Sequence, residues 1–201
     1  MKPRLLFPLL ATALLGLAAC GQQKAETSVP AASNTDAASA ASSATPAAAP
    51  QVLESNDKAI RITIPSGQFA SAGNQPELHP EGIAPEDLTL LQHDAAQNIT
   101  VYAARLGTPK RGATDYFRNL SAALKSSEGF TDVQTGAATE NRMNYRFTQT
   151  TDAGTLRENC IAIYDPANLY NVCANSSTAA PEALAATLKN VSLLQDNTLA
   201  K

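Results

Sequence analysis

Cys160 and Cys173 are the two residues of the C-terminal half whose side chains offer the most chemistry. Free thiols bind metals, exchange disulfides or act as nucleophiles, whereas paired cysteines crosslink a fold. Between them lies an Asp-Pro-Ala-Asn segment at 165–168, and Asp followed by Pro favours a type I turn. If Asp165 opposes Asn168, counting outward along both strands places Cys160 opposite Cys173, within reach of a disulfide. The sequence therefore predicts a structural disulfide.

Redox, metal and catalytic chemistry lack the motifs that they need. The cysteines have no C-x-x-C spacing, and the two histidines, His79 and His93, have no ligand spacing relative to them. His79 lies in a proline-rich loop and His93 beside a turn, and neither adjoins a serine motif such as G-x-S-x-G. We therefore expect no catalytic, metal-binding or cofactor-binding residues and no enzyme activity.

Two charged segments offer weaker candidates. Four carboxylates gather around His79: Glu77, Glu81, Glu86 and Asp87. They could bind Ca²⁺, but they lack the alternating Asp/Asn/Gly spacing of an EF-hand loop. Lys110 and Arg111 could contact an anion or a lipid headgroup. We expect both segments to be solvated connectors.

The first 19 residues have the features of an export signal. Lys2 and Arg4 form a positively charged start, and residues 5–17 are almost entirely apolar. That stretch is shorter than the roughly 20 residues that a transmembrane helix needs, and it has the length of a signal-peptide core. The sequence therefore predicts a signal peptide over residues 1–19.

Cys20 follows directly, in a setting that resembles the lipobox of bacterial lipoproteins. The matching residues are Leu17-Ala18-Ala19-Cys20, a branched residue and two small ones before the cysteine, followed by Gly21. The resemblance implies cleavage behind Ala19 and attachment of acyl chains, such as palmitate, to Cys20. It also implies the outer membrane of a Gram-negative bacterium, because Gly21 is not the aspartate that retains many lipoproteins in the inner membrane. The protein would face the periplasm, with surface exposure left open. The alternative is an ordinary secretory signal with a chance cysteine.

Residues 20–56 are predicted to be the lipidated cysteine and a disordered linker. Residues 21–50 contain 11 Ala, 5 Ser, 3 Thr and 3 Pro, too little hydrophobic surface to offset chain entropy. A flexible chain of this length spans on the order of 35 Å. The linker would hold a folded domain away from the membrane.

The rest of the chain is predicted to be one domain at 57–195 and a C-terminal tail at 196–201. Roughly 140 residues suit a single domain and exclude a two-domain enzyme. Removal of Lys2 and Arg4 with the signal peptide leaves 13 basic residues against 18 acidic ones, a net charge of −5. Such a chain cannot neutralise a row of phosphates, so we expect no nucleic-acid partner.

Alternating apolar residues predict most of the strands. Residues 141–148 alternate, and a three-residue loop at 152–154, with Gly154 in a left-handed conformation, would join them to the next strand. Tyr145 would then oppose Ile161. One face would collect Met143, Tyr145, Phe147, Ile161, Ile163, Tyr170 and Val172, and the other face Arg146, Cys160 and Cys173. Upstream, residues 88–93 and 98–106 predict a hairpin in which Leu90 opposes Val101, and residues 59–64 predict an earlier strand.

Two helices complete the predicted domain. Thr114 suits an N-cap, Tyr116, Phe117, Leu120 and Leu124 fall on one helical face, and Gly129 provides a stop. A second helix would begin near Pro181 and face the core with Leu184, Leu188 and Val191. The predicted fold class is α+β, with an antiparallel sheet of about six strands and two main helices.

Three segments resemble the PsbP/DcrB-like fold. They are 60–69 (Ile-Arg-Ile-Thr-Ile-Pro-Ser-Gly-Gln-Phe), 114–120 (Thr-Asp-Tyr-Phe-Arg-Asn-Leu) and a closing helix with Val191-Ser192-Leu193. The resemblance covers most of residues 57–195. It implies an α+β domain without a shared catalytic motif, and its bacterial members are often lipoproteins.

The leading functional hypothesis is a lipid-anchored envelope protein that acts without catalysis, as a protein-binding or assembly-support module. Its partners would be the membrane, through the lipid on Cys20, and an unidentified envelope protein. The alternative is a periplasmic carrier or binder of a small ligand or peptide, held on a sheet face opposite the helices.

Overall fold

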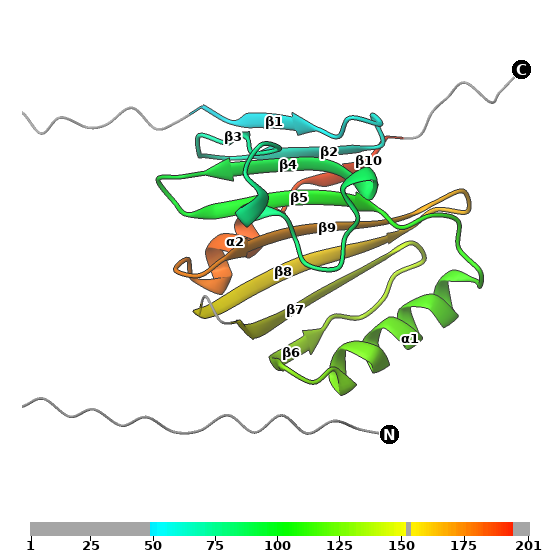
Figure 1. The fold of residues 1–201 in the computed structure, drawn as a ribbon. Coiled ribbons are helices and arrows are strands. Elements are labelled where there is room, and N and C mark those ends of the chain that lie inside the picture. Colours follow the sequence, from blue (N-terminus) through cyan, green and yellow to red (C-terminus); the bar gives the residue numbers. More distant parts are fainter. Residues whose placement is uncertain (1–48, 152–153, 195–201) are drawn as a thin grey trace, which may run out of the picture. The chain divides into compact units, whose positions relative to one another are not determined.

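The alternating apolar segments form strands in the computed structural model, which describes residues 49–151 and 154–194. The predicted signal peptide, Cys20, most of the linker and the tail at 196–201 lie outside these residues. The described part has an α+β fold with antiparallel sheets and two α-helices, as the sequence predicts (Figure 1). Within the described part, no helix is long and apolar enough to cross a membrane.

The elements follow one another closely along the chain. The strands are β1 Gln51–Glu54, β2 Ile60–Ile64, β3 Ala70–Ser71, β4 Leu88–Asp94, β5 Ile99–Arg105, β6 Phe130–Thr135, β7 Arg142–Thr151, β8 Gly154–Tyr164, β9 Leu169–Ser176 and β10 Val191–Leu193. The helices are α1 Ala113–Ser126 and α2 Pro181–Thr187, and two short 3-10 helices are η1 Pro76–Leu78 and η2 Pro85–Asp87.

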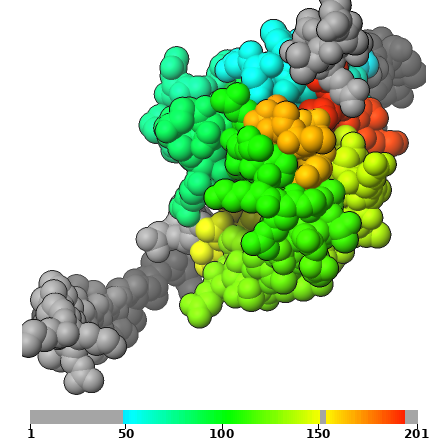
Figure 2. Space-filling view, turned by 90° about the vertical axis from the view of Figure 1, so that its right-hand side faces the viewer, coloured from blue at the N-terminus to red at the C-terminus, as the bar shows by residue number. Residues whose placement is uncertain are grey.

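The strands form two sheets instead of one. The larger has seven strands in the order β3-β4-β5-β9-β8-β7-β6, and the smaller has three in the order β1-β2-β10. At the end of the large sheet seen in Figure 2, the β8–β9 turn (orange) lies beside the segment after β5 (green). Leu106 and Leu169 join these segments, since the Leu106 amide donates to the Leu169 carbonyl over 2.8 Å.

One face of the large sheet, here called the α2 face, packs against α2 and the small sheet. Strand alternation brings Ile161 and Val172 of the large sheet into one buried cluster with Ile62 of β2. Leu184 of α2, only 1% exposed, completes this core. Ile60, Ile62 and Ile64 all point inward, as predicted for this strand.

The opposite face, here called the α1 face, packs against α1. Phe117 and Leu124 of the helix are buried there against Tyr102 and Met143 of the sheet. The helix covers one end of this face in Figure 1, and the segment that contains η1 crosses in front of the other end. The large sheet is therefore buried on both faces, with an opening on the α1 face.

The β8–β9 hairpin has the predicted register. Cys160 pairs with Cys173 and Ile161 with Val172. The turn also closes between the predicted residues, since the Asp165 backbone amide donates to the Asn168 carbonyl over 3.0 Å.

The predicted β7–β8 register is wrong by one residue. Thr151 pairs with Gly154, so the loop is 152–153 and not the predicted three residues, although Gly154 does have a positive φ of 122°. Tyr145 therefore opposes Cys160 rather than Ile161. Because side chains alternate between faces, this shift moves a whole set to the α1 face, beside the disulfide: Met143, Tyr145 and Phe147.

The predicted β4–β5 register is also wrong. Leu90 pairs with Ala103 rather than Val101, because β4 continues to Asp94, which pairs with Ile99. The Asp94 carboxylate accepts the amides of Ala96 and Gln97, and these bonds hold the turn at 95–98.

Both helices differ from the prediction at one end. The first begins at Ala113 with Gly112 as its N-cap, so Thr114 lies inside the helix and makes no cap. The second ends at Thr187, and Val191 belongs to strand β10, which pairs with β2. The spacing of the three buried residues after Pro181 fits a helix, but the last of them reaches the core from a strand.

The sequence also underestimates the number of strands. Four strands of the described part were not expected: β1, β3, β6 and β10. Strand β1 lies within the segment predicted to be linker, and its Leu53 is only 5% exposed. The folded domain therefore includes residues before position 57.

Candidate functional site

The opening on the α1 face is a cleft with a volume of about 400 Å³. Its floor is formed by strands β5, β9, β8 and β7, and residues 77–81 form one wall. Phe130 at the start of β6 lines the cleft beside Phe147, and their rings stack with centroids 4.2 Å apart.

Strand pairing places a polar row across this floor. His93 opposes Thr100, Thr100 opposes Asn175, Asn175 opposes Glu158, and Glu158 opposes Phe147. Directly opposed residues of antiparallel strands point to the same face, so these five side chains all lie on the α1 face. All of them except His93 line the cleft.

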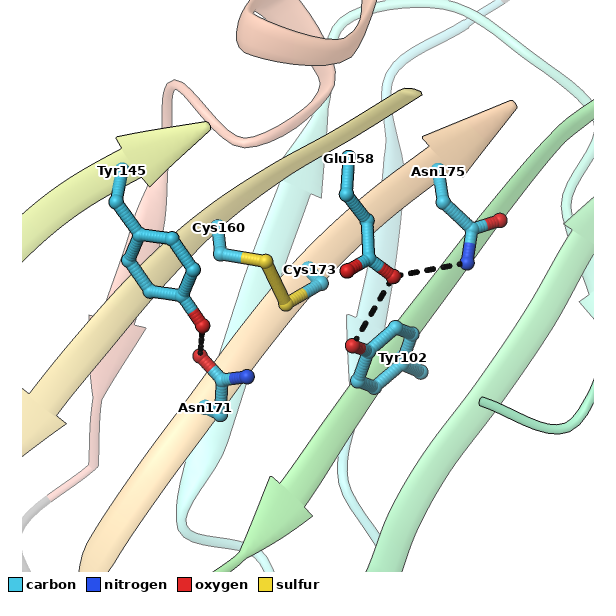
Figure 3. The surroundings of a disulfide bond; sticks show 7 residues. All are labelled: Tyr102, Tyr145, Glu158, Cys160, Asn171, Cys173 and Asn175. Carbon is cyan, nitrogen blue, oxygen red and sulfur yellow. Dashed lines mark hydrogen bonds between the residues drawn. A yellow bond between two sulfur atoms is a disulfide. The ribbon is translucent and has the colours of Figure 1, made fainter. Parts of the chain in front are cut away.

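The next row across the sheet contains the disulfide. Tyr102 opposes Cys173, Cys173 opposes Cys160, and Cys160 opposes Tyr145. A disulfide joins the two cysteines, with an S–S distance of 2.13 Å, consistent with the predicted pairing. Figure 3 shows this row beside Glu158 and Asn175 of the polar row. The Tyr145 hydroxyl donates to Asn171 Oδ1 over 2.8 Å.

Glu158 is the central charged residue of the cleft. Its Oε1 accepts hydrogen bonds from the Tyr102 hydroxyl at 3.2 Å and the Asn175 amide at 3.3 Å (Figure 3). Its Oε2 has no hydrogen-bond partner among the described residues. Every buried side-chain oxygen or nitrogen of these residues has such a partner, so Oε2 is not a buried atom. Oε2 is therefore accessible to solvent in the cleft.

The surroundings of Glu158 disfavour its charge. Burial raises the pKa of the Glu158 carboxyl above its ordinary value, and the hydrogen bonds from Asn175 and Tyr102 offset only part of this effect. Burial, followed by the Glu158 charge, also raises the pKa of Tyr102 and of Tyr145. Both phenols therefore remain protonated at neutral pH.

The wall of the cleft contains part of the predicted acidic loop. Glu77, His79 and Glu81 line the cleft, and Gln149 Nε2 lies 3.5 Å from Glu81 Oε2, linking the loop to β7. Glu86 and Asp87 are in η2 and do not line it.

The two histidines have separate partners. His79 Nε2 lies 3.3 Å from the Gly73 carbonyl oxygen, and His93 Nδ1 lies 3.1 Å from Thr100 Oγ1. A histidine that activates a hydroxyl as a nucleophile needs a second hydrogen bond, from its other ring nitrogen to a group that orients it. Within residues 49–151 and 154–194, His93 has only the contact with Thr100. We interpret the His93–Thr100 pair as a cross-strand contact.

A potential metal site would involve the disulfide. In the described part of the chain, the only close group of metal-ligating side chains is Glu158, Cys160 and Cys173, with ligand atoms within 4.8 Å of one another. The two sulfurs are bonded to each other and are not thiolate ligands. The carboxylates of Glu77 and Glu81 do not join this group.

Sequence reasoning missed the residues at the centre of the cleft: Tyr102, Glu158 and Asn175. A signal for two of them was present, because the hairpin register that pairs Cys160 with Cys173 also pairs Glu158 with Asn175. Tyr102 could not be added, since β5 and β9 lie far apart in the sequence and no turn fixes their pairing.

No protein-family model matches this chain, and no curated protein matches it either.

Proposed function

We propose that this protein is a lipid-anchored envelope protein whose domain binds a target without catalysis. The lipobox residues ending in Cys20 support the anchor, and the composition of residues 21–50 supports a tether. The location would be the outer membrane, facing the periplasm.

The cleft on the α1 face is the observation that supports a binding function. A volume of about 400 Å³ with aromatic walls and a few inward polar groups is typical of small-molecule sites. Of the two targets considered from the sequence, the cleft favours a small ligand or a peptide side chain over a flat protein surface. An envelope protein remains a candidate partner if it inserts a side chain there.

We also propose that the domain is PsbP/DcrB-like. The segments 60–69 and 114–120 support this, and they fall in β2 with its following turn and in α1. The third segment, 191–193, gives no such support because it is a strand.

The anchor is tested by replacing Cys20 with alanine in cells fed a radiolabelled palmitate. The wild-type protein should be labelled and should sediment with outer membranes. The Cys20→Ala protein should be unlabelled and should be absent from outer membranes. A Cys20→Ala protein that is still labelled, or that still sediments with outer membranes, would contradict the anchor.

Binding is tested by filling the cleft of the full chain. Leu156 is half-buried in the cleft wall, so Leu156→Trp should obstruct it, whereas Asn119→Trp changes an exposed position of α1. Each protein, in a neutral detergent, is incubated with periplasmic extract, and retained compounds are identified by mass spectrometry. The wild type and Asn119→Trp should retain the same compound, and Leu156→Trp should not. Equal retention by all three proteins, or retention by none, would overturn the cleft as a binding site.

A further inference from the structure

We infer that the cleft binds a primary ammonium group at the end of an alkyl chain, with its nitrogen against Glu158 Oε2. This inference rests on the proposed binding function and adds the chemical class of the ligand. The shared chemistry has two sources, which are a free aliphatic amine and a lysine side chain of a peptide.

The charges of the cleft favour a cation. Among the described residues that line it, three are carboxylates, Glu77, Glu81 and Glu158, and none is a lysine or an arginine. Two of the carboxylates are on the exposed wall, where they would attract a cation to the entrance. The third is on the floor, where it would contact the bound group.

The positive side chains of the floor strands point away from the cleft. Arg146 precedes Phe147 and Arg157 precedes Glu158, so strand alternation turns both arginines to the α2 face. There they line a second groove of about 280 Å³ beside α2, whose lining also includes Phe147 and Glu158 of the same two strands. Within the cleft of the described part of the chain, Glu158 therefore has no positive partner, and its two hydrogen-bond donors, Tyr102 and Asn175, are neutral.

Glu158 is half-buried, so its carboxylate loses part of its hydration, and a bound cation would offset that loss. Oε1 already accepts two hydrogen bonds, and only Oε2 is free to accept another. An arginine-type guanidinium binds a carboxylate best through two parallel bonds that use both oxygens. A single free oxygen instead suits an ammonium group, which acts as a point charge.

The walls of the cleft suit the alkyl chain that would carry the ammonium group. Phe130 and Phe147 form a stacked aromatic wall, and Leu78 and Leu156 add aliphatic surface. Burial of the methylene groups against these walls is favourable. The aromatic faces also attract a cation that lies within about 6 Å of a ring centre.

The test is calorimetric titration of the full chain in a neutral detergent at pH 7. The two probes are 1,5-diaminopentane, for a free amine, and N-acetyl-lysine methylamide, for a lysine side chain. The neutral control is 1-pentanol, and N-acetyl-arginine methylamide tests the preference for ammonium. The variant Glu158→Gln removes the charge and keeps the size, and Glu86→Gln makes the same change at an exposed glutamate outside the cleft.

At least one amine should bind, with 1-pentanol and the arginine derivative at least about tenfold weaker. Glu158→Gln should weaken amine binding about tenfold or more, and Glu86→Gln should leave it unchanged. The amine probe that binds more tightly shows whether the ammonium group comes from a free amine or from a lysine side chain. Equal binding by 1-pentanol, or unchanged binding by Glu158→Gln, would overturn the inference.

The extract experiment separates this inference from the proposed function. Acetylation of the amines in the extract should abolish retention by the wild-type protein. If a compound is retained after acetylation and is still lost in Leu156→Trp, the binding function stands and the ammonium inference fails. If neither the amines nor any extract compound binds, both fail.

Discussion

Glu158 is a carboxylate whose folded environment works against its ionised form. Its pKa is raised by burial above the ordinary value of 4.5, and its contacts in the cleft are to uncharged groups. A residue that destabilises the fold is often retained for binding or catalysis. Replacing it should therefore stabilise the protein while weakening ligand binding.

We expect Glu158→Gln to raise the urea midpoint at pH 8. Glutamine keeps the acceptor for Tyr102 and Asn175, and it removes a charge that the unfolded chain hydrates better. The gain should disappear below about pH 4, because there the glutamate is protonated in both the folded and the unfolded protein. The nearby ionisable groups that could modify this dependence are Tyr102, Tyr145, Glu77, His79 and Glu81.

Urea titrations followed by circular dichroism at pH 8 and pH 4 would measure this difference. Glu86→Gln, at an exposed position, should change neither midpoint. A Glu158→Gln protein that is less stable than the wild type at pH 8 would show that the ionised carboxylate supports the fold.

Asp94 is a buried carboxylate with the opposite balance. Burial alone would raise the pKa of Asp94, but hydrogen bonds from Gln68, Gln97 and Ala96 together outweigh burial and lower it. The backbone amide nitrogen of Gln68 lies 2.6 Å from Asp94 Oδ2, and the side-chain Nε2 of Gln97 lies 2.9 Å from the same oxygen. These bonds join the β4–β5 turn to the segment after β2, so this carboxylate supports the fold.

We expect Asp94→Asn to lower the free energy of unfolding by about 2–3 kcal/mol at pH 7, because an amide nitrogen would face two donors. The difference in unfolding free energy should have its full size above about pH 4. It should shrink as the pH falls through the lowered pKa of Asp94, because the wild type then loses the same charge. Urea denaturation at pH 7 and pH 3 would measure it. Asp115→Asn, in an exposed pair with Arg118, should cost no more than about 1 kcal/mol. Equal effects of the two substitutions would contradict this role.

At the scale of elements, turn chemistry determined which strand pairings could be predicted. The Asp165–Asn168 turn fixed the β8–β9 register, because Asp and Pro favour one turn type. Gly154 has the positive φ that the sequence predicts. A glycine at this position is compatible with loops of two or three residues, however, and the predicted three-residue loop is wrong. That error assigns the β7 side chains to the α2 face instead of the α1 face. The sequence predicts that the first strand of the β4–β5 hairpin ends at residue 93, whereas β4 continues to Asp94, whose carboxylate holds the following turn.

The disulfide stabilises the β8–β9 hairpin. We expect the double variant Cys160→Ala/Cys173→Ala to lose about 3 kcal/mol of unfolding free energy, as for a crosslink that closes a loop of roughly 15 residues. Denaturant titration under oxidising conditions would measure the loss. Both cysteines are at most 1% exposed, so a mild reductant should leave the folded wild type unchanged until denaturant is added. A double variant as stable as the wild type would show that the crosslink contributes nothing.

At the scale of the whole molecule, the cleft results from pairings between distant parts of the chain. Thr100 and Tyr102 come from β5, Asn175 from β9 and Glu77 from the segment before β4. Local patterns predicted the fold class and the hairpin that contains Glu158. They could not show that β5 lies beside β9, because these strands are far apart in the sequence and no turn fixes their register. The sequence therefore predicts a solvated acidic loop and does not show that Glu77 and Glu81 share a cleft with Glu158.

The whole domain also depends on a strand that the sequence assigned to the linker. Strand β1 contributes the buried Leu53, and the Gln51 side chain bonds both backbone groups of Phe69, donating over 2.6 Å and accepting over 2.9 Å. A chain shortened to begin at residue 57 should therefore be about 3–5 kcal/mol less stable than one that begins at residue 49. Burial of a leucine contributes about 1.5–3 kcal/mol and each hydrogen bond about 1 kcal/mol. This loss is a large part of the total stability of an ordinary domain, about 5–15 kcal/mol.

Urea denaturation of the two shortened chains would measure the contribution of β1. Gln51→Ala in the longer chain should cost about 1–2 kcal/mol, since it removes two hydrogen bonds from Phe69. Val52→Ala should cost little, because this neighbour on the same strand is 55% exposed. Equal stability of the two shortened chains would mean that the domain begins at residue 57, as its composition alone predicts. Strand β1 would then pack on the domain without adding to its stability.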